Sequence, residues 1–187
     1  MEVTTSLLVV LMFVGLLTIG IANILMSLAS IVNRSSDTRV AGIHLSWIIL
    51  MLMFYFNVFW HSLSILTAGE WDFVGFLYIE AGPILALFAT QVLLPADGIG
   101  PDSTRDRYFA ISPQYFLLFA MVQTWVVGSD FVLGNGFTTA SFGNVAGIGI
   151  AVALMLSRSY RVHVTITVAV WALFVVVAVG RVAAKTG

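Results

Sequence analysis

The stretch SLLVVLMFVGLLTIGIANILMSLASI, Ser6 to Ile31, contains no charged residue. A bilayer core about 30 Å thick is crossed by roughly 20 apolar residues in an α-helix, so this stretch is long enough to span a membrane. The residues before it lack the basic region of a secretory signal, whose apolar core is only about 7 to 15 residues long. We therefore interpret Ser6 to Ile31 as a retained first span.

The composition of the whole chain agrees with a membrane location. Of its 187 residues, 60% are hydrophobic and 9% are charged, with a mean hydropathy of +1.04, whereas about 25% are charged in an average soluble domain. The formal net charge is -1, and no long basic face exists to bind nucleic acid. The absence of cysteine excludes structural disulfides, thiolate nucleophiles and iron–sulfur clusters. The lipid bilayer is the expected partner, and nucleic acid is not.

The apolar runs divide the chain into six spans. We expect an all-α fold, a polytopic transmembrane helix bundle that forms a single domain over residues 1–187, with no soluble domain. The predicted spans are Ser6–Ile31, Val40–Leu66, Trp71–Leu94, Pro113–Leu133, Thr138–Leu156 and Val162–Val182.

The breaks between the spans are short, with one exception. The sequence GNG at residues 134–136 permits positive φ at the end of the fourth span. The long connection runs from Pro95 to Pro113, and its Ser112-Pro113 pair is typical of an N-cap followed by the first helical position. The sequence therefore predicts that the fourth helix begins at Pro113.

The basic residues predict the orientation. Six of the eight lie in connections that share one side of a six-span bundle: Arg34, Arg39, Arg105, Arg107, Arg158 and Arg161. The positive-inside rule places these connections in the cytoplasm and both termini outside. We expect an integral protein of a bacterial inner membrane.

One carboxylic acid lies deep in the third span, within FLYIEAGPILALF, residues 76–88. Glu80 is about nine residues from the outer end of this span, roughly 13 Å at 1.5 Å per residue. A buried carboxylate costs several kcal/mol, on the order of insertion and simulation estimates, unless it has water, a partner or a proton. Pro83 cannot donate to the carbonyl of Ile79, and Gly82 loosens the same turn. The sequence predicts a cation or proton site, the alternative being a protonated Glu80 that holds a kink.

Other polar residues of the outer half extend this hypothesis. Asn57 and His61 share a face of the second span, and Gln123 and Asp130 share a face of the fourth. Gln91 returns to nearly the same face as the buried acid, eleven residues after it. If these spans adjoin, the residues form a graded polar path with an acidic mouth at Glu70 and Asp72, which favours cations. The alternative for His61 and Asp130 is an interfacial position among lipid headgroups.

Two histidines near the cytoplasmic end raise the possibility of haem. His44 and His163 lie at matching depth, but a b-type haem needs two imidazoles that face each other across a cavity, and no spacing shows this. No group with metal-ligand spacing and no catalytic signature of the HExxH, GxSxG or Walker type occurs. We expect no cofactor, no bound metal and no enzymatic activity.

Two glycines predict a close helix contact. Gly143 and Gly147 form a GxxxG pair in the fifth span, and hydrogen side chains allow a neighbouring backbone to approach closely.

Several stretches together resemble a known group of proteins. They are TIGIANILMSLA in the first span, HLSWIILMLMFYFNVFW in the second, PILALFATQVLLP in the third, DRYF in the long connection and RVH before the sixth. The chain resembles uncharacterised short six-helix bacterial inner-membrane proteins with no assigned function. The resemblance implies a bacterial source and the six-helix layout. Where a histidine is expected after the Gly-Ile of the first span, this chain has Ala22-Asn23, which argues against haem.

These features lead to two hypotheses of different classes. The first is a homo-oligomeric channel or small transporter for protons or monovalent cations, because six short spans leave little protein to enclose a conduit without neighbours. The second is a membrane sensor or accessory subunit, in which Arg105, Asp106 and Arg107 contact a cytoplasmic protein partner.

Overall fold

The computed structural model describes residues 2–33, 42–67, 71–94 and 104–186, and all of its regular elements there are helices. Six helical segments are long and apolar enough to cross a membrane. The predicted all-α fold with six membrane-spanning helices is therefore confirmed. The helices are α1 (Glu2–Asn33), α2 (Gly42–His61), α3 (Leu63–Thr67), α4 (Phe73–Leu93), α5 (Thr104–Val132), α6 (Thr139–Leu156) and α7 (Tyr160–Thr186).

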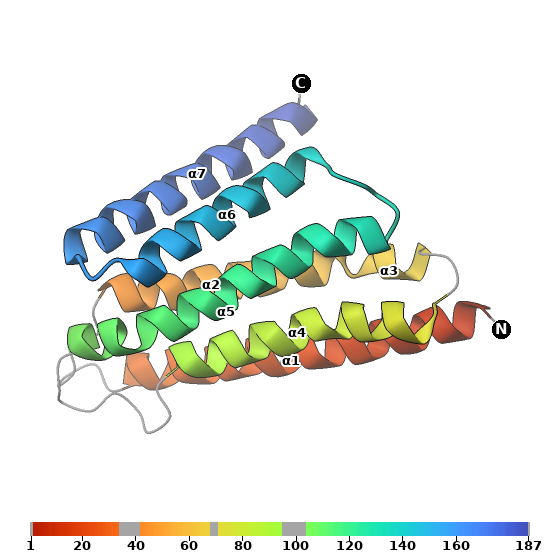
Figure 1. Cartoon of the computed structure of the whole chain (residues 1–187), viewed down its shortest axis with the longest axis horizontal. Coiled ribbons are helices and arrows are strands. Elements are labelled where there is room, and N and C mark those ends of the chain that lie inside the picture. The colour runs from red at the N-terminus through yellow and green to blue at the C-terminus, as the bar shows by residue number, and fades with distance from the viewer. Residues whose placement is uncertain (1, 34–41, 68–70, 95–103, 187) are drawn as a thin grey trace.

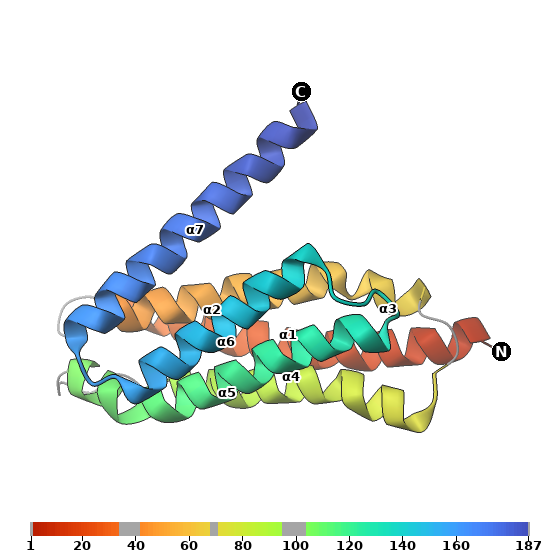
Figure 2. The same cartoon turned by 45° about the horizontal axis from the view of Figure 1, so that its top comes forward.

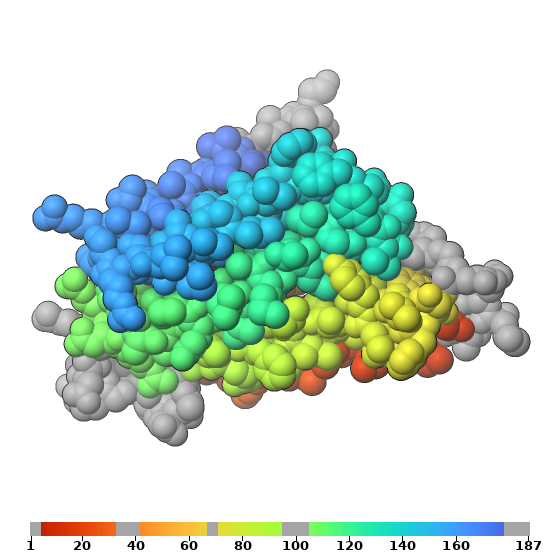
Figure 3. Space-filling model, in the orientation of Figure 1, coloured from red at the N-terminus to blue at the C-terminus, as the bar shows by residue number. Residues whose placement is uncertain are grey.

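The helices form a bundle from which the last one diverges. Helices α1, α2, α4 and α5 run side by side, and α6 covers α5 (Figure 1). Helix α7 leaves the bundle toward its carboxyl end (Figure 2), and near its start it contacts α2, α5 and α6. The side chains of α4, α5 and α6 make one continuous face in the space-filling view (Figure 3). Most of α7 is therefore left to contact lipid or another protein.

Helix α5 begins earlier than the sequence predicts. It starts at Thr104, so Pro113 lies inside the helix and not at its first position. Proline leaves the carbonyl of Phe109 without a backbone donor, but the hydroxyl of Ser112 donates to that carbonyl at 3.3 Å. The extra turns bury Tyr108, which is 0% exposed. Packing at this position explains why the helix continues through the proline.

The second span is interrupted near its end. The backbone N–H and the hydroxyl of Ser62 both donate to the carbonyl of Phe59, at 3.1 and 2.7 Å. This tight turn separates α2 from the short helix α3.

The turn between α5 and α6 agrees with the prediction. Gly134 and Gly136 have φ of 76° and 65°, values that favour glycine. Helix α6 then begins with a reciprocal cap, in which the side chains of Thr138 and Ser141 each accept from the other's backbone N–H. These two features fix the direction in which α6 returns along α5.

Aromatic side chains fill the centre of the bundle. The Trp47 ring of α2 meets Tyr115, Phe116 and Phe119 of α5 edge to face, with centroids 4.9 to 5.9 Å apart. Such pairs contribute beyond their buried area, so this cluster holds α2 against α5.

Candidate functional site

Glu80 is the most unusual polar residue of the described structure. It lies in the second turn of α4, and only 2% of its surface is exposed. Neither carboxyl oxygen has a hydrogen-bond partner among the described residues. Buried polar groups in native proteins are nearly always hydrogen-bonded, and an exception calls for an explanation such as a function, a water or an ion.

The turn around Glu80 is held by a tryptophan of α5. The indole N–H of Trp125 donates to the carbonyl of Tyr78 at 2.7 Å, and the Tyr78 hydroxyl donates to the Trp125 carbonyl at 3.2 Å. The indole lies directly over Gly82, where a Cβ atom would overlap its ring. Gly82 is therefore required for this approach, and the paired bonds attach α4 to α5 at Tyr78, two residues before the acid.

Pro83 lies inside α4, and the helix continues beyond it to Leu93. Its ring nitrogen cannot donate to the carbonyl of Ile79, so that carbonyl loses its usual partner one residue before Glu80. The Glu80 carboxyl group, which has no partner among the described residues, and the Ile79 carbonyl, which lacks its usual donor, could offer oxygen atoms to a proton or a cation.

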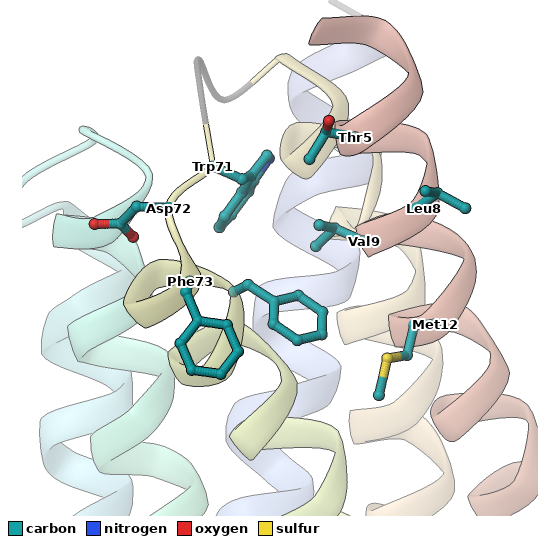
Figure 4. Close-up of a pocket in the computed structure, with 8 residues that line it drawn as sticks. Thr5, Leu8, Val9, Met12, Trp71, Asp72 and Phe73 are labelled. Atoms are coloured by element: carbon teal, nitrogen blue, oxygen red, sulfur yellow. The ribbon is translucent and has the colours of Figure 1, made fainter. Parts of the chain in front are cut away.

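A groove between α1 and α4 lies one turn above the acid. This α1/α4 groove has a volume of about 490 Å³, and Figure 4 shows its lining residues, which are Thr5, Leu8, Val9, Met12, Trp71, Asp72, Phe73 and Phe76. Phe76 lines the groove, and Glu80, which follows it by four residues, is not among the lining residues. Since residues four apart share a face of a helix, Glu80 lies on nearly the same face of α4 as Phe76.

Three residues of the predicted polar path lie on the outside of the bundle. Asn57, His61 and Gln91 are exposed, whereas Glu80 is buried. The His61 ring bonds through Nδ1 to the carbonyl of Asn57 at 2.7 Å, which satisfies it locally. The structure does not bring these three side chains into the interior with the acid. Glu70, proposed for the mouth, lies outside the described residues.

The other two path residues face α6. Gln123 is buried, and a Cβ atom on Gly147 would lie 2.5 Å from its amide nitrogen, so these residues meet closely. Asp130 accepts a hydrogen bond from the hydroxyl of Ser141 at 2.9 Å. Gly143 has no atom within 4 Å of the position where a Cβ would stand. One glycine of the GxxxG pair therefore contacts α5, and the other is open.

The two histidines at the opposite end lie on either side of Tyr108. The centroid of the Tyr108 ring is 6.0 Å from that of His44 and 5.4 Å from that of His163. His44 bonds through Nε2 to the carbonyl of Leu93 at 2.7 Å. The Tyr108 ring is therefore a neighbour of both imidazoles.

Both ring nitrogens of His163 are also engaged. Its Nε2 lies 2.9 Å from the carbonyl of Ser157, which can only accept, so this nitrogen carries a proton. In the neutral ring Nδ1 then accepts from the Tyr108 hydroxyl at 2.8 Å. The hydroxyl of Thr167 donates to the His163 carbonyl and accepts from the indole of Trp47, at 2.7 and 3.0 Å. This network attaches α7 to α2 and α5.

Sequence reasoning missed Trp125 and Tyr108 as supporting residues. Each lies more than 40 positions along the chain from the residue that it bonds, and no local pattern indicates such a pair. Within residues 2–33, 42–67, 71–94 and 104–186, no group of three His, Asp or Glu side chains could hold a metal ion.

Comparison of the chain with protein-family models, curated proteins and solved structures finds no match. The helices and the buried acid define the class: a polytopic integral membrane protein with a carboxyl group inside one span that has no partner among residues 2–33, 42–67, 71–94 and 104–186.

Proposed function

We propose that the protein is a homo-oligomeric channel or small transporter for protons or monovalent cations, and that Glu80 takes up and releases the ion. The observation that carries this proposal is the burial of Glu80 without a partner for either oxygen among the described residues. An ionisable residue inside a span is costly to keep and usually marks an ion or proton pathway.

The surroundings of Glu80 favour an ion role over a purely structural one. A protonated acid that served only to hold a kink would donate its hydrogen bond to a nearby acceptor. The described structure contains no such bond, and Trp125 already holds the turn through Tyr78. The carboxyl group is therefore not needed to fix the backbone around it.

A homo-oligomer is part of the same proposal. Helix α6 leaves open space at Gly143 and Gly149, and most of the described side chains of α7 beyond Thr167 are exposed. Small residues on an exposed helix face allow a second helix to approach closely. A second copy of the chain that packed against these exposed faces of α6 and α7 would supply further helices around an ion pathway, which six spans alone are too few to enclose.

The proposed location is a bacterial inner membrane with both termini outside. The start of α5 and the turn before α7 lie at one end of the bundle, where the Arg105 guanidinium carbon is 4.4 Å from the centre of the Tyr160 ring. The exposed Arg107 and Arg158 belong to these two segments, and the exposed Arg161 lies in the first turn of α7, whereas Arg34 and Arg39 lie outside the described residues. The positive-inside rule assigns this end to the cytoplasm.

The accessory-subunit alternative depends on the first turn of α5. Arg105, Asp106 and Arg107 are exposed there, but Arg105 already covers the Tyr160 ring. Its cation–π contact joins α5 to α7 inside this chain, which leaves less of the turn for a separate partner.

The test is ion flux in proteoliposomes that contain only the purified protein. We expect pH-dependent flux from the wild type and none from Glu80→Gln, which keeps the size of the side chain but cannot titrate. Gln91→Leu is the matched control on the same helix, because its side chain is exposed, and it should retain flux. A wild type without flux, or Glu80→Gln with wild-type flux, would overturn the proposal.

A further inference from the structure

We infer that an anionic phospholipid binds where the start of α5 meets the start of α7, with its phosphate at Arg105, Arg158 and Arg161. This lipid site lies on the outside of the bundle, and it depends neither on Glu80 nor on ion transport. Lipid binding can therefore be measured directly on the purified protein.

Side-chain contacts hold the start of α5 against the start of α7. The Tyr108 hydroxyl lies 2.8 Å from Nδ1 of His163, and the guanidinium carbon of Arg105 lies 4.4 Å from the centre of the Tyr160 ring. Nε2 of the same imidazole lies 2.9 Å from the carbonyl of Ser157, which keeps the turn after α6 at this end too. Segments that are about 50 residues apart in the sequence thus meet at one corner of the bundle (Figures 1 and 2).

The charges at this corner are mostly positive. Residues 104–108 and 157–161 contain four arginines and one acid, all with exposed side chains: Arg105, Arg107, Arg158, Arg161 and Asp106. Two of these arginines lie two residues before and one residue after Tyr160, whose ring Arg105 covers. Arg107 is on a different face of α5, because residues two apart on a helix do not share a face. A guanidinium group matches a phosphate with paired N–H donors, so three arginines around one ring favour a phosphate ligand.

Exposed apolar residues beside the arginines favour a lipid over a soluble phosphate. Leu156 is 73% exposed just before the turn. From Arg161, helical spacing along one face of α7 leads to Thr165, Val168 and Ala172, and all four side chains are exposed. The eleven residues from the first to the last of them rise roughly 16 Å at 1.5 Å per residue, about half of a bilayer core about 30 Å thick. An acyl chain of one leaflet therefore fits along this face while the phosphate stays at the arginines.

The divergence of α7 keeps this face accessible. Beyond the corner the helix leaves the bundle (Figure 2), and Val168 and Leu173 are 62% and 60% exposed. Residues 172–177 are all exposed, which is more than one full turn. A lipid on one face of α7 and a second copy of the chain on another can therefore bind together.

The experiment is native mass spectrometry of the purified full-length protein, titrated with dioleoyl phosphatidylglycerol or with phosphatidylcholine of the same acyl chains. We expect the first phosphatidylglycerol to bind at least about tenfold more tightly than phosphatidylcholine, whose choline cancels the phosphate charge; this ratio corresponds to 1.4 kcal/mol. Arg158→Gln and Arg161→Gln should each weaken phosphatidylglycerol binding about fivefold, the roughly 1 kcal/mol of one basic residue near an anionic membrane surface. Both side chains are exposed, so neither substitution should disturb the fold.

Two controls separate this site from general attraction of anions. Arg181→Gln removes an arginine from the same helix, twenty residues beyond Arg161, and it should bind phosphatidylglycerol like the wild type. Excess glycerol 3-phosphate carries a phosphate without acyl chains, and it should leave the lipid bound. Equal binding of the two lipids, wild-type binding by Arg158→Gln or Arg161→Gln, or equal weakening by Arg181→Gln would overturn the inference. Displacement of the lipid by glycerol 3-phosphate would also overturn it, because the ligand would then be a soluble phosphate.

Discussion

Replacing Gly82 with alanine tests how the acid-bearing turn is held. The added methyl group would overlap the indole of Trp125, and this ring cannot move freely. Its N–H bonds to the Tyr78 carbonyl at 2.7 Å, and its face stacks on Phe13 with centroids 6.2 Å apart. Overpacking costs about 1–3 kcal/mol, and losing the hydrogen bond adds about 0.5–1.5 kcal/mol.

Alanine also gains helix propensity of roughly 0.5–1 kcal/mol over glycine. The net destabilisation is therefore about 2 kcal/mol, which lowers the melting temperature by about 4–8 °C for a chain of this length. The assay is thermal unfolding in detergent. Gly15→Ala is the matched control, because no atom lies within 4 Å of its Cβ position, and it should not lower the melting temperature. Equal melting temperatures for Gly82→Ala and the wild type would refute the proposed contact.

Three further predictions concern other contacts. Tyr108→Phe should leave Nδ1 of His163 without its donor, cost about 1–3 kcal/mol and speed hydrogen exchange at the start of α7; unchanged exchange would contradict this. Gly147→Leu should lower the melting temperature because the added side chain would overlap Gln123 of α5. Gly143→Leu should leave the melting temperature unchanged and change the oligomeric mass. Identical behaviour of the two variants would contradict the contact between Gly147 and α5. Pro83→Ala restores a backbone donor, so it should fold at least as stably as the wild type and retain ion flux. A damaged Pro83→Ala would favour the kink hypothesis.

The number of spans could be predicted from the sequence because each run of apolar residues is long and ends in polar or glycine-containing segments. The start of α5 could not, because Ser112-Pro113 has the local pattern of a helix start. Only the burial of Tyr108 beside His163, 55 positions away, explains why the helix extends to Thr104. Long-range packing overrides the local signal there.

The candidate site could be predicted only in part. Glu80 and Pro83 lie three positions apart, so helix geometry alone places them in one turn. The rest of the predicted path depends on which face of each helix meets a neighbour. Gln91 shares nearly the same face as Glu80 on an ideal helix, yet it is exposed and the acid is buried. Which helices pack around α4 at each height decides whether a residue is buried or exposed. No local sequence pattern around Glu80 or Gln91 indicates those neighbours.

The ionisation of Glu80 in a lipid bilayer tests the central claim most directly. Infrared difference spectra of the reconstituted protein, recorded across pH, would follow the carbonyl band of a protonated carboxylic acid. We predict a band that decreases reversibly as pH rises and that is absent from Glu80→Gln, because an ion-binding carboxyl group must exchange its proton with water. A Glu80 band of constant intensity from acidic to strongly alkaline pH would contradict the account and show a permanently protonated acid.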